Sequence, residues 1–237
     1  MATRRGPAGW RRFGRPHSFP RLMEALLLLP ILLLSFVVHE LAHAWVAWRE
    51  GDPTAYELGR VTLNPIPHTD LFGTILIPLM LLASGSGFLI GWAKPVPIDT
   101  GRLRRGRTSR VLVSAAGVAA NLVLAGVLTV VVIAVHHLAV AVPSLAGATD
   151  AVRGMAAAGI RLNFVLFVFN LLPVPPLDGS HLLGELLPAR WRARYASLER
   201  WGIAVLALLL LSGAISVLLA PALLLERISW TVIAWWT

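Results

Sequence analysis

The chain contains no cysteine and few charged residues, and both shortages narrow its possible functions. Without cysteine, disulfides and thiolate-ligated zinc sites are excluded. Charged residues make up only 14% of the 237 positions, whereas soluble domains carry about 25%. Hydrophobic residues make up 57%, and several apolar runs approach the roughly 20 residues that a spanning helix needs. The sequence therefore predicts an all-α integral membrane protein, a helical bundle that crosses the bilayer several times.

The positive charge of the chain does not indicate nucleic-acid binding. The formal net charge is +9, but most arginines lie in short segments that flank apolar runs. In such places basic residues orient a membrane protein and contact anionic headgroups. We therefore expect the lipid bilayer, and not a nucleic acid, to be the partner of these residues.

The arrangement of apolar runs predicts one membrane domain after a short tail. Residues 1–22 are basic and contain glycine and proline, so we expect a disordered tail followed by a single membrane-embedded domain over 23–237. Short extended or re-entrant elements are expected between the first two main spans, where 73–92 fits either a simple crossing or a hairpin. The expected spans are 24–48, 110–140, 155–172 and 201–220, with a short return segment at 222–236.

The sequence HELAH at 39–43 lies inside the first apolar run. Ionisable groups in a membrane span indicate a functional site by default. His39 and His43 are four residues apart, so they project from one face of a helix and can bind one zinc ion. Glu40 can then take a proton from a metal-bound water. The alternative, a helix with two hydrogen-bonded core histidines, leaves this cluster of ionisable groups in apolar surroundings unexplained.

A catalytic zinc site usually has three protein ligands and an open fourth position. Asp178 is favoured as the third ligand because a proline-rich stretch (170–179) brings it back directly after the third span. Irregular backbone at membrane depth is tolerated only where it lines a protein cavity. The spacing alone also fits a turn aspartate before a glycine. The other candidates are His136, His137 and His181.

Together these motifs resemble the site-2 protease family, peptidase family M50, whose members are intramembrane zinc metalloproteases. The resemblance rests on HELAH within a span and on N-x-x-P-x-P-x-x-D-G at 170–179. SAAGVAAN (114–121) is similar to the family's A-G-P-x-x-N, although Val118 replaces the proline, which puts the local bend of that helix in doubt. Segments 59–78 and 91–97 resemble the compact prokaryotic branch, which lacks PDZ and CBS domains.

The resemblance implies a role for each matching residue. His39, His43 and Asp178 match the zinc ligands and Glu40 the catalytic glutamate. Asn170 matches an asparagine assigned to substrate or oxyanion contact, although the sequence without this resemblance favours a helix cap or an interhelical hydrogen bond. The implied activity is hydrolysis of peptide bonds in or near transmembrane segments of other proteins. The alternative is a non-catalytic metal-binding membrane protein, such as a transporter or an inactive scaffold.

Substrate access and orientation can also be predicted. Segment 91–97 fits an edge that accepts an unwound substrate by strand addition, and equally a rigid loop at headgroup level. Because Asp178 and the histidines must meet, the loops at 49–72, 93–110 and 179–200 should share one face of the bundle. These loops hold twelve Lys and Arg residues, against six in the tail. The positive-inside rule then places the site nearer the cytoplasmic face of the cell membrane.

Overall fold

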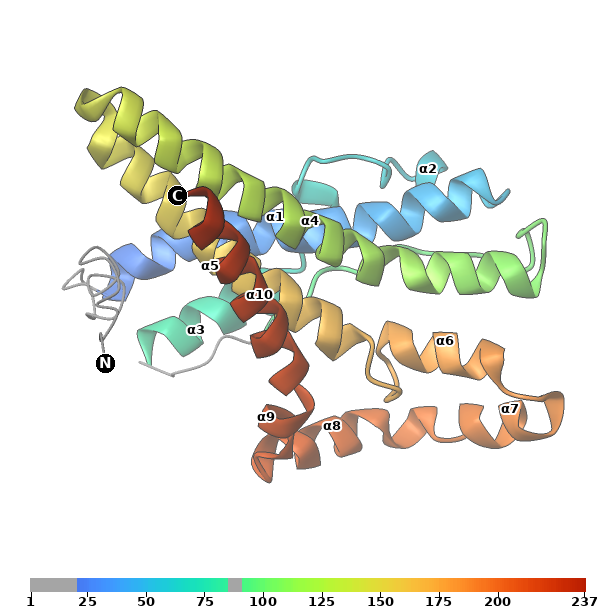
Figure 1. Cartoon of the computed structure of the whole chain (residues 1–237). Helices are drawn as coiled ribbons and strands as arrows, with labels where there is room; N and C mark the ends of the chain where they lie inside the picture. The colour runs from blue at the N-terminus through green and yellow to red at the C-terminus, as the bar shows by residue number, and fades with distance from the viewer. Residues whose placement is uncertain (1–20, 85–90) are drawn as a thin grey trace.

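The computed structural model describes residues 21–84 and 91–237 (Figure 1). Within these residues every regular element is helical, as the sequence predicts. Most of the expected N-terminal tail lies outside the described residues, and its last two positions begin the first helix, α1 (Arg21–Arg49). The division into a tail and one domain therefore stays a prediction.

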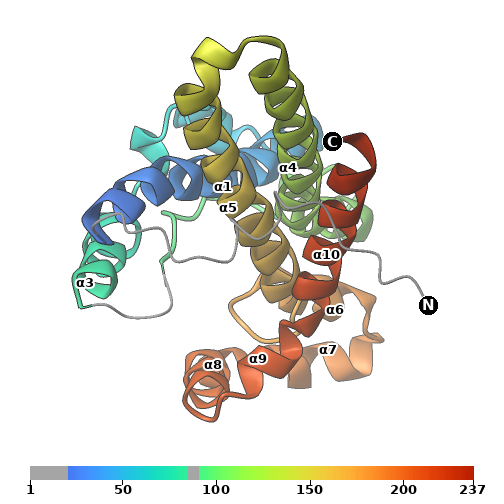
Figure 2. The ribbon, with the colours of Figure 1, turned by 60° about the vertical axis from the view of Figure 1, so that its left-hand side comes forward.

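Three helices in the described part of the chain are long and apolar enough to cross a membrane. They are α1, α4 (Arg107–Ala141) and α5 (Ala146–Asn170), which correspond to the first three expected spans. Helices α4 and α5 lie side by side along most of their lengths (Figures 1 and 2). Only the short turn η4 (Pro143–Leu145) joins them. The third span is thus longer than expected. Residues 141–154, which separate the second and third expected spans, are mostly helical.

The core lies where α1, α4 and α5 meet. Ile31, Leu128 and Ile160 are buried there, one from each helix. Gly159 permits the close approach, because a Cβ atom at that position would lie 2.6 Å from the Ile31 side chain. The C-terminal helix α10 (Ala220–Trp236) packs across α5 in both views of the fold (Figures 1 and 2).

The stretch after α1 contains short helices that support a long irregular segment. These helices are α2 (Thr54–Glu57), η2 (Ile66–His68), η3 (Leu71–Leu76) and α3 (Ile77–Ala83). Buried Asp52 accepts a hydrogen bond from the Asp99 N–H at 2.7 Å. Buried Arg60 donates to the Lys94 carbonyl oxygen at 2.6 Å. Both contacts fasten the irregular segment 91–106 to the chain that directly follows α1.

The two ends of the apolar segment 73–92 are in contact. The Trp92 N–H donates to the Gly73 carbonyl oxygen at 3.0 Å, and the Thr74 hydroxyl donates to the Trp92 carbonyl oxygen at 2.7 Å. Gly73 is needed for this contact, because a Cβ atom there would lie 2.3 Å from the Trp92 indole. Contact between its two ends is expected for a hairpin and not for a single crossing, although residues 85–90 lie outside the described part of the chain.

The C-terminal third differs from the expected fourth span at 201–220. That stretch contains two short helices, α8 (Gly202–Leu211) and α9 (Ala214–Leu218), separated at Gly213, whose φ is 73°. Only glycine adopts this left-handed conformation readily, so the helix ends there. Pro221, between the expected span and the expected return segment, lies in the first turn of α10, where its missing N–H needs no partner. Before them, α6 (Asp178–Leu186) and α7 (Ala189–Ala196) lead away from the third span.

Candidate metal centre

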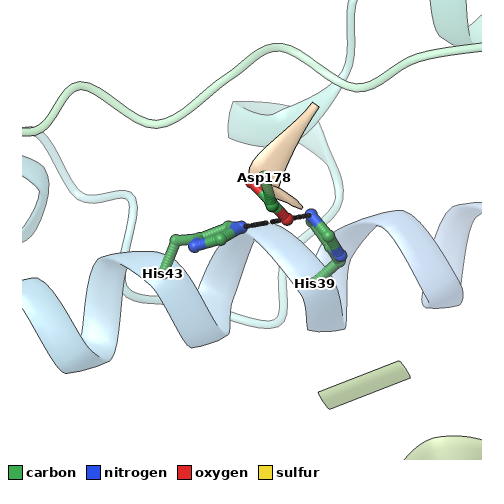
Figure 3. A group of neighbouring side chains, drawn as sticks. All are labelled: His39, His43 and Asp178. Carbon is green, nitrogen blue, oxygen red and sulfur yellow. Dashed lines mark hydrogen bonds and ion pairs between the residues drawn. The ribbon is translucent and has the colours of Figure 1, made fainter. Parts of the chain in front are cut away.

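Three predicted ligands converge on one point between α1 and α6. His39 and His43 lie one turn apart on α1, and their Nε2 atoms are 3.1 Å from each other. Asp178, the first residue of α6, places its Oδ2 atom 3.2 Å from each of these nitrogens (Figure 3). Among the described residues, these three form the one group of His, Asp and Glu side chains able to hold a metal ion.

The hydrogen bonds around the histidines fix which nitrogen is available. His43 Nδ1 lies 2.7 Å from the carbonyl oxygen of Val113, which can only accept a hydrogen bond, so Nδ1 carries the proton. His39 Nδ1 lies 2.6 Å from Asn121 Oδ1. In the neutral rings both Nε2 atoms therefore present lone pairs to one another and to the carboxylate of Asp178.

Such a cluster of acceptors fits a cation. Asp178 Oδ2 is buried and has no hydrogen-bond partner in the described structure, an arrangement that is costly unless a positive charge is present. Ligand atoms at about 2.0–2.2 Å from a tetrahedral zinc ion lie about 3.3–3.6 Å apart. The observed separations of 3.1 and 3.2 Å are close to that value. The side chains present thus fit a zinc ion.

Helix α4 forms the back of this site. At Gly117 a Cβ atom would lie 2.2 Å from His43 Nε2 and 2.6 Å from His39 Cε1, so the space for a metal depends on a glycine. Asn121 lies one turn further along α4 and contacts His39. Val118 is buried within a continuous helix, so the valine at the family's proline position does not interrupt α4.

Glu40 lies beside the ligands and is held from the opposite wall. Its Oε2 atom accepts a hydrogen bond from the Val96 N–H at 2.9 Å. Glu40 and the three ligands line one cavity of about 710 Å³. The general base expected from the sequence and the expected metal ligands therefore face the same space.

The remaining sequence candidates take different places. Asn170 ends α5 and lines the same cavity, where its Nδ2 atom donates to the Leu166 carbonyl oxygen at 3.1 Å. His181 also lines the cavity but does not belong to the cluster. His136 and His137 lie about 28–30 Å further along α4 from Gly117, at about 1.5 Å per residue, which excludes them as ligands at this centre.

The loops that border the site share one end of the bundle, as expected. Arg110 of α4 contacts Glu185 of α6 at 2.6 Å, and the Arg104 N–H donates to the Glu50 carbonyl oxygen at 2.8 Å. Hydrogen bonds from the Arg110 guanidinium hold the pKa of Glu185 below its ordinary value. The pair therefore connects the start of α4 with the helix that carries Asp178.

Several residues around the site were not predicted from the sequence. Arg60 supports the segment that holds Glu40, and Ser35 and Asn163 are fully buried polar residues near the metal ligands. Polar side chains within apolar spans are a usable signal for the last two. Arg60 lies in a polar loop, where an arginine has no distinguishing pattern.

Comparisons with known proteins agree with this centre. The chain matches the family model "Peptidase family M50" over residues 27–156 and 139–213. "Putative zinc metalloprotease YwhC" of Bacillus subtilis (strain 168) is 42% identical over 192 residues, which cover 81% of this chain and 83% of that protein. "Putative zinc metalloprotease Rip2" of Mycolicibacterium smegmatis (strain ATCC 700084 / mc(2)155) is 33% identical over 202 residues, with 85% and 72% covered. No solved structure matches the chain.

The metal implied by the family and by the names of these relatives is Zn²⁺, the ion that the observed donor set fits. The matched regions include the HELAH helix, the helix behind it and the proline-rich approach to Asp178. The motifs, the match to the family model and the relatives that align over most of their length agree. This chain therefore belongs to peptidase family M50, the site-2 protease family.

Proposed function

We propose that the protein is an intramembrane zinc metalloendopeptidase of the cell membrane that hydrolyses peptide bonds in or near transmembrane segments of other proteins. One observation carries the proposal: His39, His43 and Asp178 converge beside Glu40 in a cavity between apolar helices. A metal site with an adjacent carboxylate is the arrangement that activates water for hydrolysis. The apolar helices around it favour substrates that lie in the same bilayer.

Each side chain has a distinct part in the proposed reaction. His39, His43 and Asp178 hold the ion, which when bound lowers the pKa of water towards about 7 and polarises a carbonyl group. Glu40 takes a proton from the attacking water and returns it to the leaving amine. The Val96 N–H holds Oε2 of Glu40, which leaves the other carboxylate oxygen for proton transfer.

Asn170 is proposed to contact the substrate. One N–H of its side-chain amide is bonded to the Leu166 carbonyl oxygen within its own helix. Its second N–H has no partner in the described structure and belongs to a residue that lines the cavity. This amide can donate to the oxygen of the scissile peptide as negative charge develops there.

The substrate would be presented in extended form. A helical segment hides its amides in hydrogen bonds, so it must unwind before attack. The N–H groups of Trp92, Lys94 and Val96 all bond inward, to the Gly73 oxygen, the His68 oxygen and Glu40. This alternation has the two-residue period of extended chain. The N–H of Ala93 has no partner among the described residues, so we propose it as the position where an incoming strand pairs.

The site is proposed to open nearer the cytoplasmic side. The loops around it contain most of the basic residues outside the tail, and the observed contacts bring them to one end of the bundle. Positively charged loops of this length remain preferentially in the cytoplasm.

A non-catalytic metal-binding protein, such as a transporter or scaffold, is the second candidate. A transporter needs ligands along several spans, whereas the observed ligand set forms one closed group in the described structure. An inactive scaffold has no need of a carboxylate held beside the metal by a backbone N–H. Both considerations favour catalysis.

The proposal is tested by cleavage of single-span membrane proteins with the purified protein in detergent. Glu40→Gln should abolish cleavage and retain zinc, while Asp178→Ala should lose zinc. Glu57→Gln is the matched control, because Glu57 is exposed on α2 and away from the cavity. Cleavage by Glu40→Gln at the parent rate, or full zinc content in Asp178→Ala, would contradict the assigned roles.

A further inference from the structure

We propose that Asn163 and Ser35 position the metal ligand His39 through Asn121, although neither belongs to a zinc-binding motif. The inference rests on the proposed role of His39 as a zinc ligand. Asn163 lies on α5 and Ser35 on α1, and with Asn121 of α4 they are all fully buried, at 0% exposure. We refer to these three residues as the buried relay.

The buried relay is a continuous series of hydrogen bonds. His39 Nδ1 lies 2.6 Å from Asn121 Oδ1, and Asn121 Nδ2 lies 2.8 Å from Asn163 Oδ1. Asn163 Nδ2 lies 2.9 Å from Ser35 Oγ, whose hydroxyl donates to the Ile31 carbonyl oxygen at 2.7 Å. The series therefore begins at a metal ligand, crosses three membrane helices and ends on the backbone of α1.

The donor and the acceptor of each hydrogen bond can be assigned by starting at the Ile31 end of the series. The Ile31 oxygen can only accept, so the Ser35 hydroxyl donates to it and offers a lone pair to Asn163. Asn163 Nδ2 also donates to the Gly159 carbonyl oxygen at 2.9 Å, which fixes this nitrogen as the donor end of the amide. Its oxygen must then face Asn121, and the Asn121 oxygen must face His39. The relay thus places the proton on His39 Nδ1 and leaves Nε2 free for a metal.

The two histidines differ in what holds them. His43 is held by the backbone carbonyl of Val113, so its hydrogen-bond partner is not a side chain. His39 depends entirely on side chains. In an apolar interior a reversed amide would leave a buried donor or acceptor unpaired, which is unfavourable. Residues that orient metal ligands in this way affect affinity for the metal as well as stability.

Zinc affinity of the full-length protein in detergent tests the inference. Asn163→Leu replaces the amide with an apolar side chain, and Ser35→Ala removes only a hydroxyl group. We expect Asn163→Leu to weaken zinc binding by about 10- to 100-fold and Ser35→Ala to weaken it less, measured by competition with a chromophoric chelator. Thr129→Val is the matched control, because Thr129 is a buried hydroxyl on α4 bonded only within its helix, to the Ala125 oxygen.

Two further measurements separate positioning from simple packing. If the relay acts through Asn121, the double variant Asn121→Leu/Asn163→Leu should bind zinc no more weakly than Asn121→Leu alone, whereas independent packing defects would multiply. The absorption spectrum of the Co²⁺-loaded protein should also change in Asn163→Leu and not in Thr129→Val. If Asn163→Leu does not fold, the comparison of Ser35→Ala with Thr129→Val decides.

The outcomes distinguish this inference from the proposed function. If His39→Ala binds zinc as tightly as the parent protein, the proposed metal site itself is wrong. If His39→Ala loses zinc while Asn163→Leu and Ser35→Ala retain the parent affinity, the site stands and the relay is overturned. If the double variant loses zinc affinity by the product of the two single-variant losses, the relay is likewise overturned and Asn163 serves helix packing alone.

Discussion

The backbone N–H of Val96 donates to Glu40 Oε2 at 2.9 Å, although 56 residues separate the two positions. The proposed general base is thus held by the cavity wall that we propose to receive the substrate. The same segment is fastened from behind by Arg60 and by the His68 backbone. A change in this wall should therefore alter the position of the base as well as the binding of substrate.

Replacing Val96 with proline removes the donor without touching Glu40. We expect the cleavage rate to fall by about 10- to 100-fold, because a catalytic group displaced by 1 Å can lose that much, while zinc content stays at the parent value. Val96→Ala is the matched control, since it keeps the N–H and loses only packing. Equal rates for Val96→Pro and the parent would show that Glu40 does not depend on this hydrogen bond.

Gly117→Ala should close the metal site. The new Cβ atom would lie 2.2 Å from His43 Nε2, so the imidazoles must move and zinc content, measured by atomic absorption, should drop sharply. Gly126→Ala on the same helix serves as control, because no atom lies within 4 Å of its Cβ position. That variant should retain zinc and gain up to about 1 kcal/mol from helix propensity. Retention of zinc by both variants would contradict the site geometry.

Arg60 should contribute more to stability than Arg102. It is buried, and its guanidinium contacts the carbonyl oxygens of Lys94 and Pro95. Arg60→Gln should therefore destabilise the protein by about 1–3 kcal/mol, the cost of a buried acceptor left unpaired, and Arg60→Lys by less. Arg102→Gln disrupts a half-exposed ion pair with Asp99 in the same loop and should change the unfolding temperature little. Similar shifts for the two glutamine variants would refute this assignment.

The Arg110–Glu185 pair predicts a pH dependence of stability. Hydrogen bonds from Arg110 lower the pKa of Glu185 in the folded state, so the ionised carboxylate stabilises the fold above the unfolded pKa of about 4.3. This stabilisation is lost as the pH falls through the lowered folded value. The unfolding temperature of the parent should thus exceed that of Glu185→Gln at pH 7, and the difference should shrink towards pH 3. A constant difference would show that the pair does not titrate in this way.

The convergence of the three candidate metal ligands was the most predictable part of the molecule. His39 and His43 are fixed by local helix geometry, because residues four apart always share a face. Asp178 required an argument about the irregular backbone after α5, and the structure brings it to the histidines. The contacts within the buried relay and around Arg60 could not be predicted, because most of the partners are distant in sequence and no local pattern says which residues will meet.

The fold was predictable where hydropathy alone decides it. Three long apolar helices were expected and are present in the described residues. The fourth was wrong because a single glycine, Gly213, adopts a left-handed conformation that interrupts an otherwise apolar run. The contact between Gly73 and Trp92 brings the two ends of 73–92 together, whereas the composition of this segment had left a crossing and a hairpin equally open.

The Nδ1–H group of His39 donates to Asn121 Oδ1, and that of His43 donates to the Val113 carbonyl oxygen. These hydrogen bonds fix the rotamers of both histidines when the chain folds. The side-chain entropy is therefore lost during folding and not when the metal binds. The metal-free protein should therefore keep both imidazoles in the orientation that binds the ion. Rebinding of the ion should then need little rearrangement of α1 or α4.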